Sequence, residues 1–102
     1  MAKNLEIALL FDFYGDMLTE KQRDVVELYY DNDLSLSEIA ENEGITRQGV
    51  RDSIKRAEAQ LLEMEARLHL ARRFREMREG IAAIRKAAGE IQDLNDRFGY
   101  SR

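Results

Sequence analysis

The sequence predicts an all-α protein, with a small helix-turn-helix domain followed by long C-terminal amphipathic helices. The chain of 102 residues contains no proline, the residue that most readily breaks a helix. Apolar residues recur at three- and four-residue spacing along most of the chain, as on one face of an α-helix. Two Ser/Thr-x-x-Glu/Gln segments stand before such stretches and are typical of helix N-termini.

The composition favours a globular protein of the cytoplasm. Apolar residues make up 44% of the chain and charged residues 35%, which is typical of folded domains. No stretch approaches the roughly 20 apolar residues that span a bilayer, so we expect no membrane association. Acidic residues interrupt the N-terminal apolar run, which therefore does not resemble a signal peptide. The chain has no cysteine, and we expect neither a disulfide nor a thiolate metal site.

Two helices are predicted before the motif. The first runs from Leu5 to about Leu18 and is apolar on so much of its surface that we expect burial on more than one side. The second runs from Glu20 to about Tyr30, with Thr19 as its N-cap and Gln22 as the capping-box partner. The apolar positions of the first helix are Leu5, Ile7, Leu9, Leu10, Phe11, Phe13, Tyr14 and Met17.

A helix-turn-helix motif is predicted at about residues 35–56, inside a domain of residues 1–62. Ser35 and Glu38 form a second capping box that opens the first helix of the motif. Gly44 stands where the turn requires a positive φ, which glycine adopts without steric cost. Ile45 is expected to pack into the core, and Thr46 to cap the second helix.

The second helix of the motif presents polar side chains suited to DNA. Arginine can bind guanine through two hydrogen bonds, glutamine can bind adenine in the same way, and aspartate can accept from cytosine. Residues 1–43 carry three basic and eleven acidic side chains, whereas residues 44–102 carry thirteen basic and nine acidic ones. The basic field therefore begins where this helix begins. The candidate DNA-binding residues are Thr46, Arg47, Gln48, Arg51, Asp52, Lys55 and Arg56.

Simpler interpretations remain open for the same residues. The motif could be an ordinary helical hairpin of a bundle, or a surface for protein contacts. The polar face could be a solvated helix side with i,i+4 pairs such as Asp52 with Arg56, and Asp52 could also orient Arg51 or Lys55.

An apolar stripe continues to the end of the chain. We predict one helix from Arg47 to about Glu79 and another from Ile81 to about Arg97, with a continuous helix as the alternative. The register slips before Gly80, which either overwinds a coiled coil or marks a break between helices. A helix of about 30 residues runs roughly 45 Å, so residues 63–102 favour a homodimer over a hairpin within one chain. The candidate dimer-interface residues are Leu61, Met64, Leu68, Phe74, Met77, Ile81, Ile84 and Ile91.

The arginine-rich run at residues 72–78 has three interpretations. It could grip phosphates of DNA, or act as an arginine-rich helix that binds RNA. We favour the third, the polar flank of an oligomerising helix. His69, the single histidine, is expected at the surface or in an interface. No phosphate loop, H-x-x-x-H pair or convergent carboxylate pair is present, so we expect no enzyme, no metal and no cofactor.

Part of the motif resembles region 4 of bacterial sigma factors. The matching residues are Leu34-Ser35-Leu36-Ser37-Glu38-Ile39-Ala40 and Gly44-Ile45-Thr46-Arg47. This resemblance implies that Arg47, Gln48, Arg51 and Lys55 occupy the positions at which such motifs meet DNA.

Residues 5–75 resemble more closely the YlxM family of small helix-turn-helix proteins. The matching segments are Leu9 to Gln22, Tyr29 to Leu36, and Ile45-Thr46-Arg47-Gln48-Gly49-Val50. The resemblance implies a bacterial cytoplasmic protein encoded beside the signal recognition particle GTPase, with a regulatory role. We therefore expect a DNA-binding regulator, with an adaptor that binds protein or RNA of the signal recognition particle machinery as the alternative.

Overall fold

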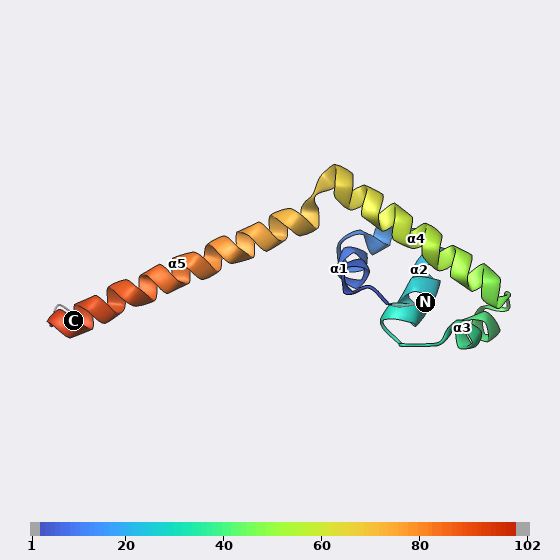
Figure 1. Cartoon of the computed structure of the whole chain (residues 1–102), viewed down its shortest axis with the longest axis horizontal. Helices are drawn as coiled ribbons and strands as arrows, with labels where there is room; N and C mark the ends of the chain where they lie inside the picture. Colours follow the sequence, from blue (N-terminus) through green and yellow to red (C-terminus); the bar gives the residue numbers. More distant parts are fainter. Residues whose placement is uncertain (1–2, 100–102) are drawn as a thin grey trace. The chain divides into compact units, whose positions relative to one another are not determined.

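The structure is a computed structural model that describes residues 3–99. They form five α-helices and one short 3-10 helix (Figure 1). The elements are α1 (Leu5–Tyr14), η1 (Gly15–Met17), α2 (Glu20–Tyr30), α3 (Leu36–Glu43), α4 (Arg47–Leu68) and α5 (Leu70–Phe98). The all-α prediction is confirmed. No helix in the described range is long and apolar enough to cross a membrane.

The chain divides into two compact units. The N-terminal unit is Met1–Ala71 and the C-terminal unit is Arg72–Arg102, whereas the sequence analysis places a boundary after residue 62. In the N-terminal unit, α4 packs against α1, α2 and α3 (Figure 1). The C-terminal unit consists of α5 beyond its first turn.

The predicted helix starts are confirmed by their caps. Thr19 accepts from the backbone N–H of Gln22, whose side chain reaches back to the N–H of Thr19. Ser35 and Glu38 make the same reciprocal pair. The N–H and hydroxyl of Ser35 favour the charged form of Glu38 and lower the pKa of its carboxyl. These local bonds satisfy N–H groups that a helix cannot satisfy internally.

The core of the N-terminal unit has two clusters on the two sides of α2. Val26 belongs to the cluster beside α1, and its neighbour Val25 belongs to the cluster beside α3. Both valines are fully buried. The first cluster holds Ile7, Leu10, Tyr14, Leu18, Val26, Ala57, Leu61 and Ala71. The second holds Val25, Tyr29, Leu36, Ile39, Val50 and Ile54. Since α4 contributes to both, its position is set by the whole unit.

The prediction for the first helix was wrong in two respects. Its α-helical part ends at Tyr14, and the chain continues as the 3-10 helix η1. Its apolar residues are also not buried on all the sides where they occur, because Leu5, Leu9 and Met17 are exposed. The buried and partly buried side chains of α1 that pack into the core are Ile7, Leu10, Phe11, Phe13 and Tyr14.

The predicted break at Gly80 was also wrong. α5 runs through Gly80 without interruption, and the break falls at His69, between α4 and α5. His69 has φ 55° and ψ 30°, a left-handed conformation that non-glycine residues rarely adopt. The side chain of His69 is partly exposed, and the residue forms the C-cap of α4.

A buried hydrogen-bond network holds the chain just after this break. The hydroxyl of Tyr14 donates to Glu65 Oε1 at 2.7 Å and accepts from the N–H of Leu70 at 3.0 Å. Glu65 Oε1 also accepts from the N–H of Ala71 at 3.0 Å. The first N–H groups of α5 are thereby satisfied by α1 and α4, as a helix start requires. Burial is the main reason that the pKa of Tyr14 is raised.

Candidate nucleic-acid interface

The turn between α3 and α4 has the geometry that the sequence predicts. Gly44 adopts φ 69° and ψ 31°, in the left-handed region. The N–H groups of Gly44 and Ile45 both bind the carbonyl oxygen of Ala40, which ends α3. Ile45 packs, partly buried, against the cluster beside α3. The chain therefore reverses within three residues and begins α4 at Arg47.

Thr46 caps α4 with its side chain. Its hydroxyl accepts from the N–H of Gly49 at 3.0 Å, as expected of a threonine N-cap. A Cβ on Gly49 would lie 3.2 Å from this hydroxyl oxygen and 3.8 Å from Cδ1 of Ile45. A side chain at position 49 would thus point toward the turn. The lack of a side chain at Gly49 therefore removes no contact group from the outer face of α4.

The outer face of α4 carries the predicted DNA-binding residues. Val50, Ile54 and Ala57 form the inner side of the helix and are fully buried. Arg51 is half-buried at the edge of the outer face. The residues that the structure leaves exposed there are Thr46, Arg47, Gln48, Asp52, Lys55 and Arg56. The three side chains Arg47, Gln48 and Arg51 line an open hollow of about 340 Å³.

Asp52 contacts a side chain that none of its interpretations named. Its carboxylate accepts from Nε2 of Gln48 at 2.9 Å, whereas the alternatives left open were Arg51, Lys55, Arg56 and a cytosine. The Gln48–Asp52 pair joins two candidate base-reading side chains one helical turn apart. It orients the amide of Gln48 along the outer face of α4.

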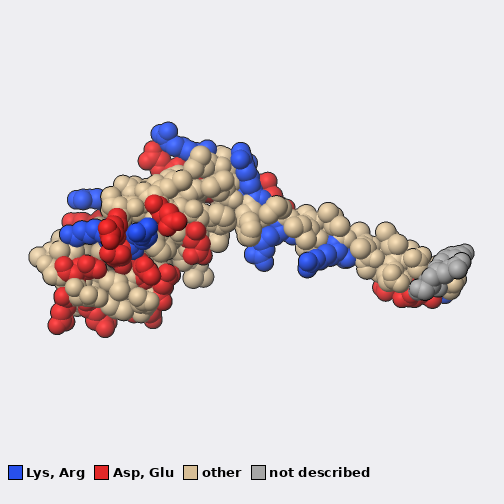
Figure 2. All heavy atoms as spheres, turned by 180° about the vertical axis from the view of Figure 1, so that it is seen from behind, with Lys and Arg blue, Asp and Glu red and all other residues tan. Residues whose placement is uncertain are grey.

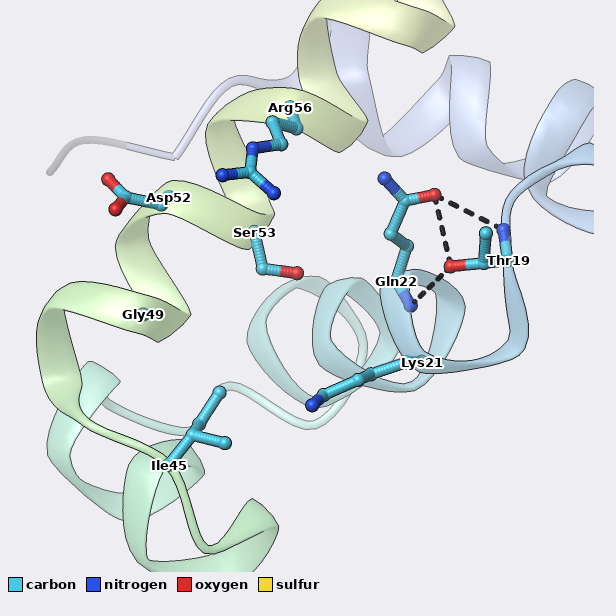
Figure 3. A pocket seen from close by; sticks show the side chains of 8 residues that line it. All are labelled: Thr19, Lys21, Gln22, Ile45, Gly49, Asp52, Ser53 and Arg56. Atoms are coloured by element: carbon cyan, nitrogen blue, oxygen red, sulfur yellow. Dashed lines mark hydrogen bonds between the residues drawn. The ribbon is translucent and has the colours of Figure 1, made fainter.

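A second hollow of about 420 Å³ lies between α4 and the start of α2 (Figure 3). From α4 it is lined by Gly49, Asp52, Ser53 and Arg56, and the turn contributes Ile45. The start of α2 contributes Thr19, Lys21 and Gln22. In Figure 3 the Lys21 side chain extends into the space between the two helices.

Lys21 and Ser53 were missed by the sequence analysis. Both line the hollow next to the outer face of α4, and each has a side chain able to donate to a phosphate oxygen. Nothing in the local sequence indicates that the start of α2 faces α4. That proximity follows from the packing of both helices on the common core.

Acidic side chains gather elsewhere on the N-terminal unit. The face shown in Figure 2 carries many aspartates and glutamates on this unit. One hollow of about 260 Å³ joins α2 to α3 and is lined by Asp24, Glu27, Leu28, Asn32, Asn42 and Glu43. The first turns of α1, α2 and α3 contain Glu6, Glu20 and Glu38 respectively, whereas that of α4 contains no acidic residue.

The candidate dimer residues fall into two groups. Leu61 is fully buried in the core of its own chain, and Met64 packs, partly buried, against that core. Leu61 therefore has no surface to offer a second chain. The exposed members are Leu68, Phe74, Met77, Ile81, Ile84 and Ile91.

Known proteins of one family match the chain over nearly its whole length. Residues 1–98 match the family described as "UPF0122: Putative helix-turn-helix protein, YlxM / p13 like". UPF0122 proteins of Bacillus cereus (strain AH187) and Bacillus anthracis (strain A0248) are each 43% identical to the chain over 96 residues. The alignment with each covers 94% of this chain and 87% of the relative.

Proposed function

The chain belongs to the UPF0122 family of YlxM/p13-like helix-turn-helix proteins, and on that basis we propose that it binds double-stranded DNA through the outer face of α4. Binding would make it a regulatory protein, and the family resemblance points to genes of the signal recognition particle pathway as its targets. Arg47, Gln48 and Arg51 are the proposed base-reading residues, and Lys55 and Arg56 the proposed phosphate contacts.

The observation that carries this proposal is the charge at the start of α4. An acidic residue near a helix N-terminus stabilises the helix by interacting with its dipole, and α1, α2 and α3 each have one there. In the first turns of α4 the chain instead has Arg47 and Arg51, which oppose the dipole. This arrangement is unfavourable for the helix alone and favourable for a helix that approaches a polyanion.

The geometry of the face fits a major groove. An α-helix of ordinary width enters this groove with the residues of its first turns facing the base edges. Arg47 and Arg51 line one open hollow with Gln48, and their long side chains can reach neighbouring base pairs or the flanking phosphates. The Gln48–Asp52 pair must open, or present the free edge of the amide, when Gln48 reads adenine.

A salt titration with matched variants tests the proposal. Binding of the full chain to labelled genomic DNA fragments is followed by fluorescence anisotropy from low to physiological salt. Each phosphate contact contributes about 0.9 to the slope of log K against log salt. Arg47→Ala together with Arg51→Ala should weaken binding at least roughly tenfold with little change in this slope, because both arginines are assigned to base edges rather than to phosphates.

The control variant removes two positive charges that lie outside the motif. Arg67 is exposed on the last turn of α4, and Arg97 on the last turn of α5. Arg67→Ala together with Arg97→Ala should leave both the affinity and the slope nearly unchanged. Absence of binding at low salt, or equal losses in the two double variants, would contradict the proposal.

We also propose that the chain forms a homodimer through the apolar side chains exposed on α5. The five exposed candidate residues on this helix provide the contact, since exposed apolar stripes on long helices are typical of paired helices; they are Phe74, Met77, Ile81, Ile84 and Ile91. Ile84→Lys together with Ile91→Lys should dissociate the dimer. A mass by light scattering that equals the monomer at every concentration of the wild-type chain would refute self-association.

A second candidate function rests on the acidic hollow between α2 and α3. Asp24, Glu27 and Glu43 give this surface a charge that repels nucleic acid and attracts a basic protein. The family resemblance suggests a protein of the signal recognition particle machinery as the partner of this acidic surface. Capture of the particle's GTPase, lost in the Asp24→Lys and Glu43→Lys double variant, would favour this adaptor role. Failure to retain the GTPase would count against it.

A further inference from the structure

α5 carries an apolar stripe along its whole length. Eight large apolar side chains on it are exposed by 39–69% of their surface. They recur at spacings of three and four residues, apart from one spacing of seven between Ile84 and Ile91, which places most of them on one side of a helix that follows a heptad repeat. These residues are Leu70, Phe74, Met77, Ile81, Ile84, Ile91, Leu94 and Phe98.

The stripe extends equally to both sides of Ile84. Met77 and Ile91 each lie seven residues from Ile84, and Leu70 and Phe98 each lie fourteen residues from it. A partner helix centred near Ile84 can therefore cover the whole stripe in either direction. The apolar pattern alone does not choose between a parallel and an antiparallel partner.

Charge distinguishes the two halves of α5. Between Leu70 and Lys86 there are six basic and two acidic residues, whereas between Ala87 and Phe98 there are three acidic and one basic. Figure 2 shows lysines and arginines along the first half of this helix and acidic side chains near its far end. Paired helix axes lie about 8–10 Å apart, close to the Debye length of about 8 Å at physiological salt. Charges on one helix therefore act on those of its neighbour.

The same charges oppose the dipole of α5 itself. Its first turn has no acidic residue, and basic residues follow it directly. Glu90, Asp93 and Asp96 lie toward the C-terminal end, where the dipole is negative. In an antiparallel pair, each basic half lies beside the acidic half of the partner and the negative end of its dipole. A parallel pair would instead place the two basic halves side by side.

We propose that α5 pairs antiparallel with α5 of a second copy of this chain, with the crossing centred near Ile84. The inference rests on the proposed self-association and adds its direction. With roughly 80 Å² exposed on each of the eight side chains, the pair would remove roughly 1,300 Å² from water, within the range of stable protein interfaces. A second copy of the chain can therefore cover the apolar stripe of α5 and match its charges.

The direction has a consequence for the N-terminal units. In an antiparallel pair the first residues of the two α5 helices lie at opposite ends. With 29 residues in the helix and a rise of about 1.5 Å per residue, these ends are roughly 40 Å apart. The two α4 helices are then attached to the dimer at separate points, which suits two DNA half-sites rather than one.

Spin-label distances in the full-length chain test the direction. The chain contains no cysteine, so Ala83→Cys and Arg97→Cys each give a unique label site. Both residues are exposed, and they lie fourteen residues apart on the same side of a heptad repeat. An antiparallel pair predicts a short distance at position 83 and a distance of roughly 35–45 Å at position 97. Equal short distances at both sites would overturn the direction, and absence of any distance would overturn the dimer itself.

Charge reversal provides the matched control. Glu90→Lys with Asp93→Lys and Asp96→Lys makes the second half of α5 basic. An antiparallel dimer should then dissociate roughly tenfold more readily at low salt. Adding Arg72→Glu, Arg75→Glu and Arg78→Glu should restore the affinity, because the two halves are again opposite in charge. A parallel dimer would be weakened much less by the first set, because like charges already face each other there, and a loss well below tenfold would overturn the proposal.

Discussion

Removing the hydroxyl of Tyr14 should destabilise the protein far more than removing that of Tyr30. Tyr14 is fully buried, and its hydroxyl bonds both Glu65 and the N–H of Leu70. Hydrogen bonds to charged groups contribute about 1.5–3 kcal/mol, and a buried donor without a partner costs about 1–3 kcal/mol. Tyr14→Phe should therefore lower the free energy of unfolding by about 2–3 kcal/mol. For a domain of this size, that lowers the melting temperature by roughly 10–15 °C.

Tyr30→Phe is the matched control. The Tyr30 hydroxyl also donates to a carboxylate, Glu58 Oε2 at 2.5 Å, but at a partly exposed site where water can replace it. Its loss should cost about 1 kcal/mol. Urea unfolding followed by circular dichroism gives both values, and hydrogen exchange should show faster exchange at Leu70 and Ala71 in Tyr14→Phe alone. Equal losses in the two variants would refute the reasoning that this network stabilises the start of α5.

Three further outcomes follow from the backbone and the tyrosines. Gly44→Ala should destabilise the protein by about 1–2 kcal/mol in thermal unfolding, because φ is 69° there; an unchanged melting temperature would contradict the left-handed turn. His69→Gly should leave the free energy of unfolding unchanged or raise it, because φ is 55° there. Ala66→Gly inside α4 should instead lower it by about 1 kcal/mol. Equal losses in the two variants would contradict a helix break at His69. Burial raises the pKa of both Tyr14 and Tyr30 above the usual value of about 10. The stabilisation from the two protonated hydroxyls is therefore complete below about pH 10 and is lost as the pH rises further. Urea midpoints that stay constant between pH 8 and pH 11 would contradict this.

The caps and the turn of the motif could be predicted because their causes are local. The two capping boxes need only residues three apart, and Gly44 needs only its own freedom to adopt a positive φ. The buried side of α4 could be predicted in the same way, since Val50, Ile54 and Ala57 follow the helical period. The same period places Arg47, Gln48, Asp52, Lys55 and Arg56 on the exposed side, and their contact with DNA stays a prediction.

The helix break could not be predicted, because its causes are distant in sequence. Nothing around His69 is a glycine or a proline; the chain turns there because Tyr14, more than fifty residues earlier, binds the N–H of Leu70. The prediction placed the break beside Gly80, but a single glycine costs a helix only about 1 kcal/mol and does not end it. The position of Lys21 beside Ser53 could not be predicted for a related reason, as only tertiary packing brings the start of α2 beside α4.

If the outer face of α4 meets DNA, a residue-by-residue map of binding should locate the contact there. Duplex DNA is titrated at low salt into the full-length chain labelled with ¹⁵N, and the amide shifts are followed by NMR. The largest shifts should fall at residues 46–56, and they should diminish as salt is raised. Shifts confined to other parts of the chain, or no shifts at low salt, would contradict it.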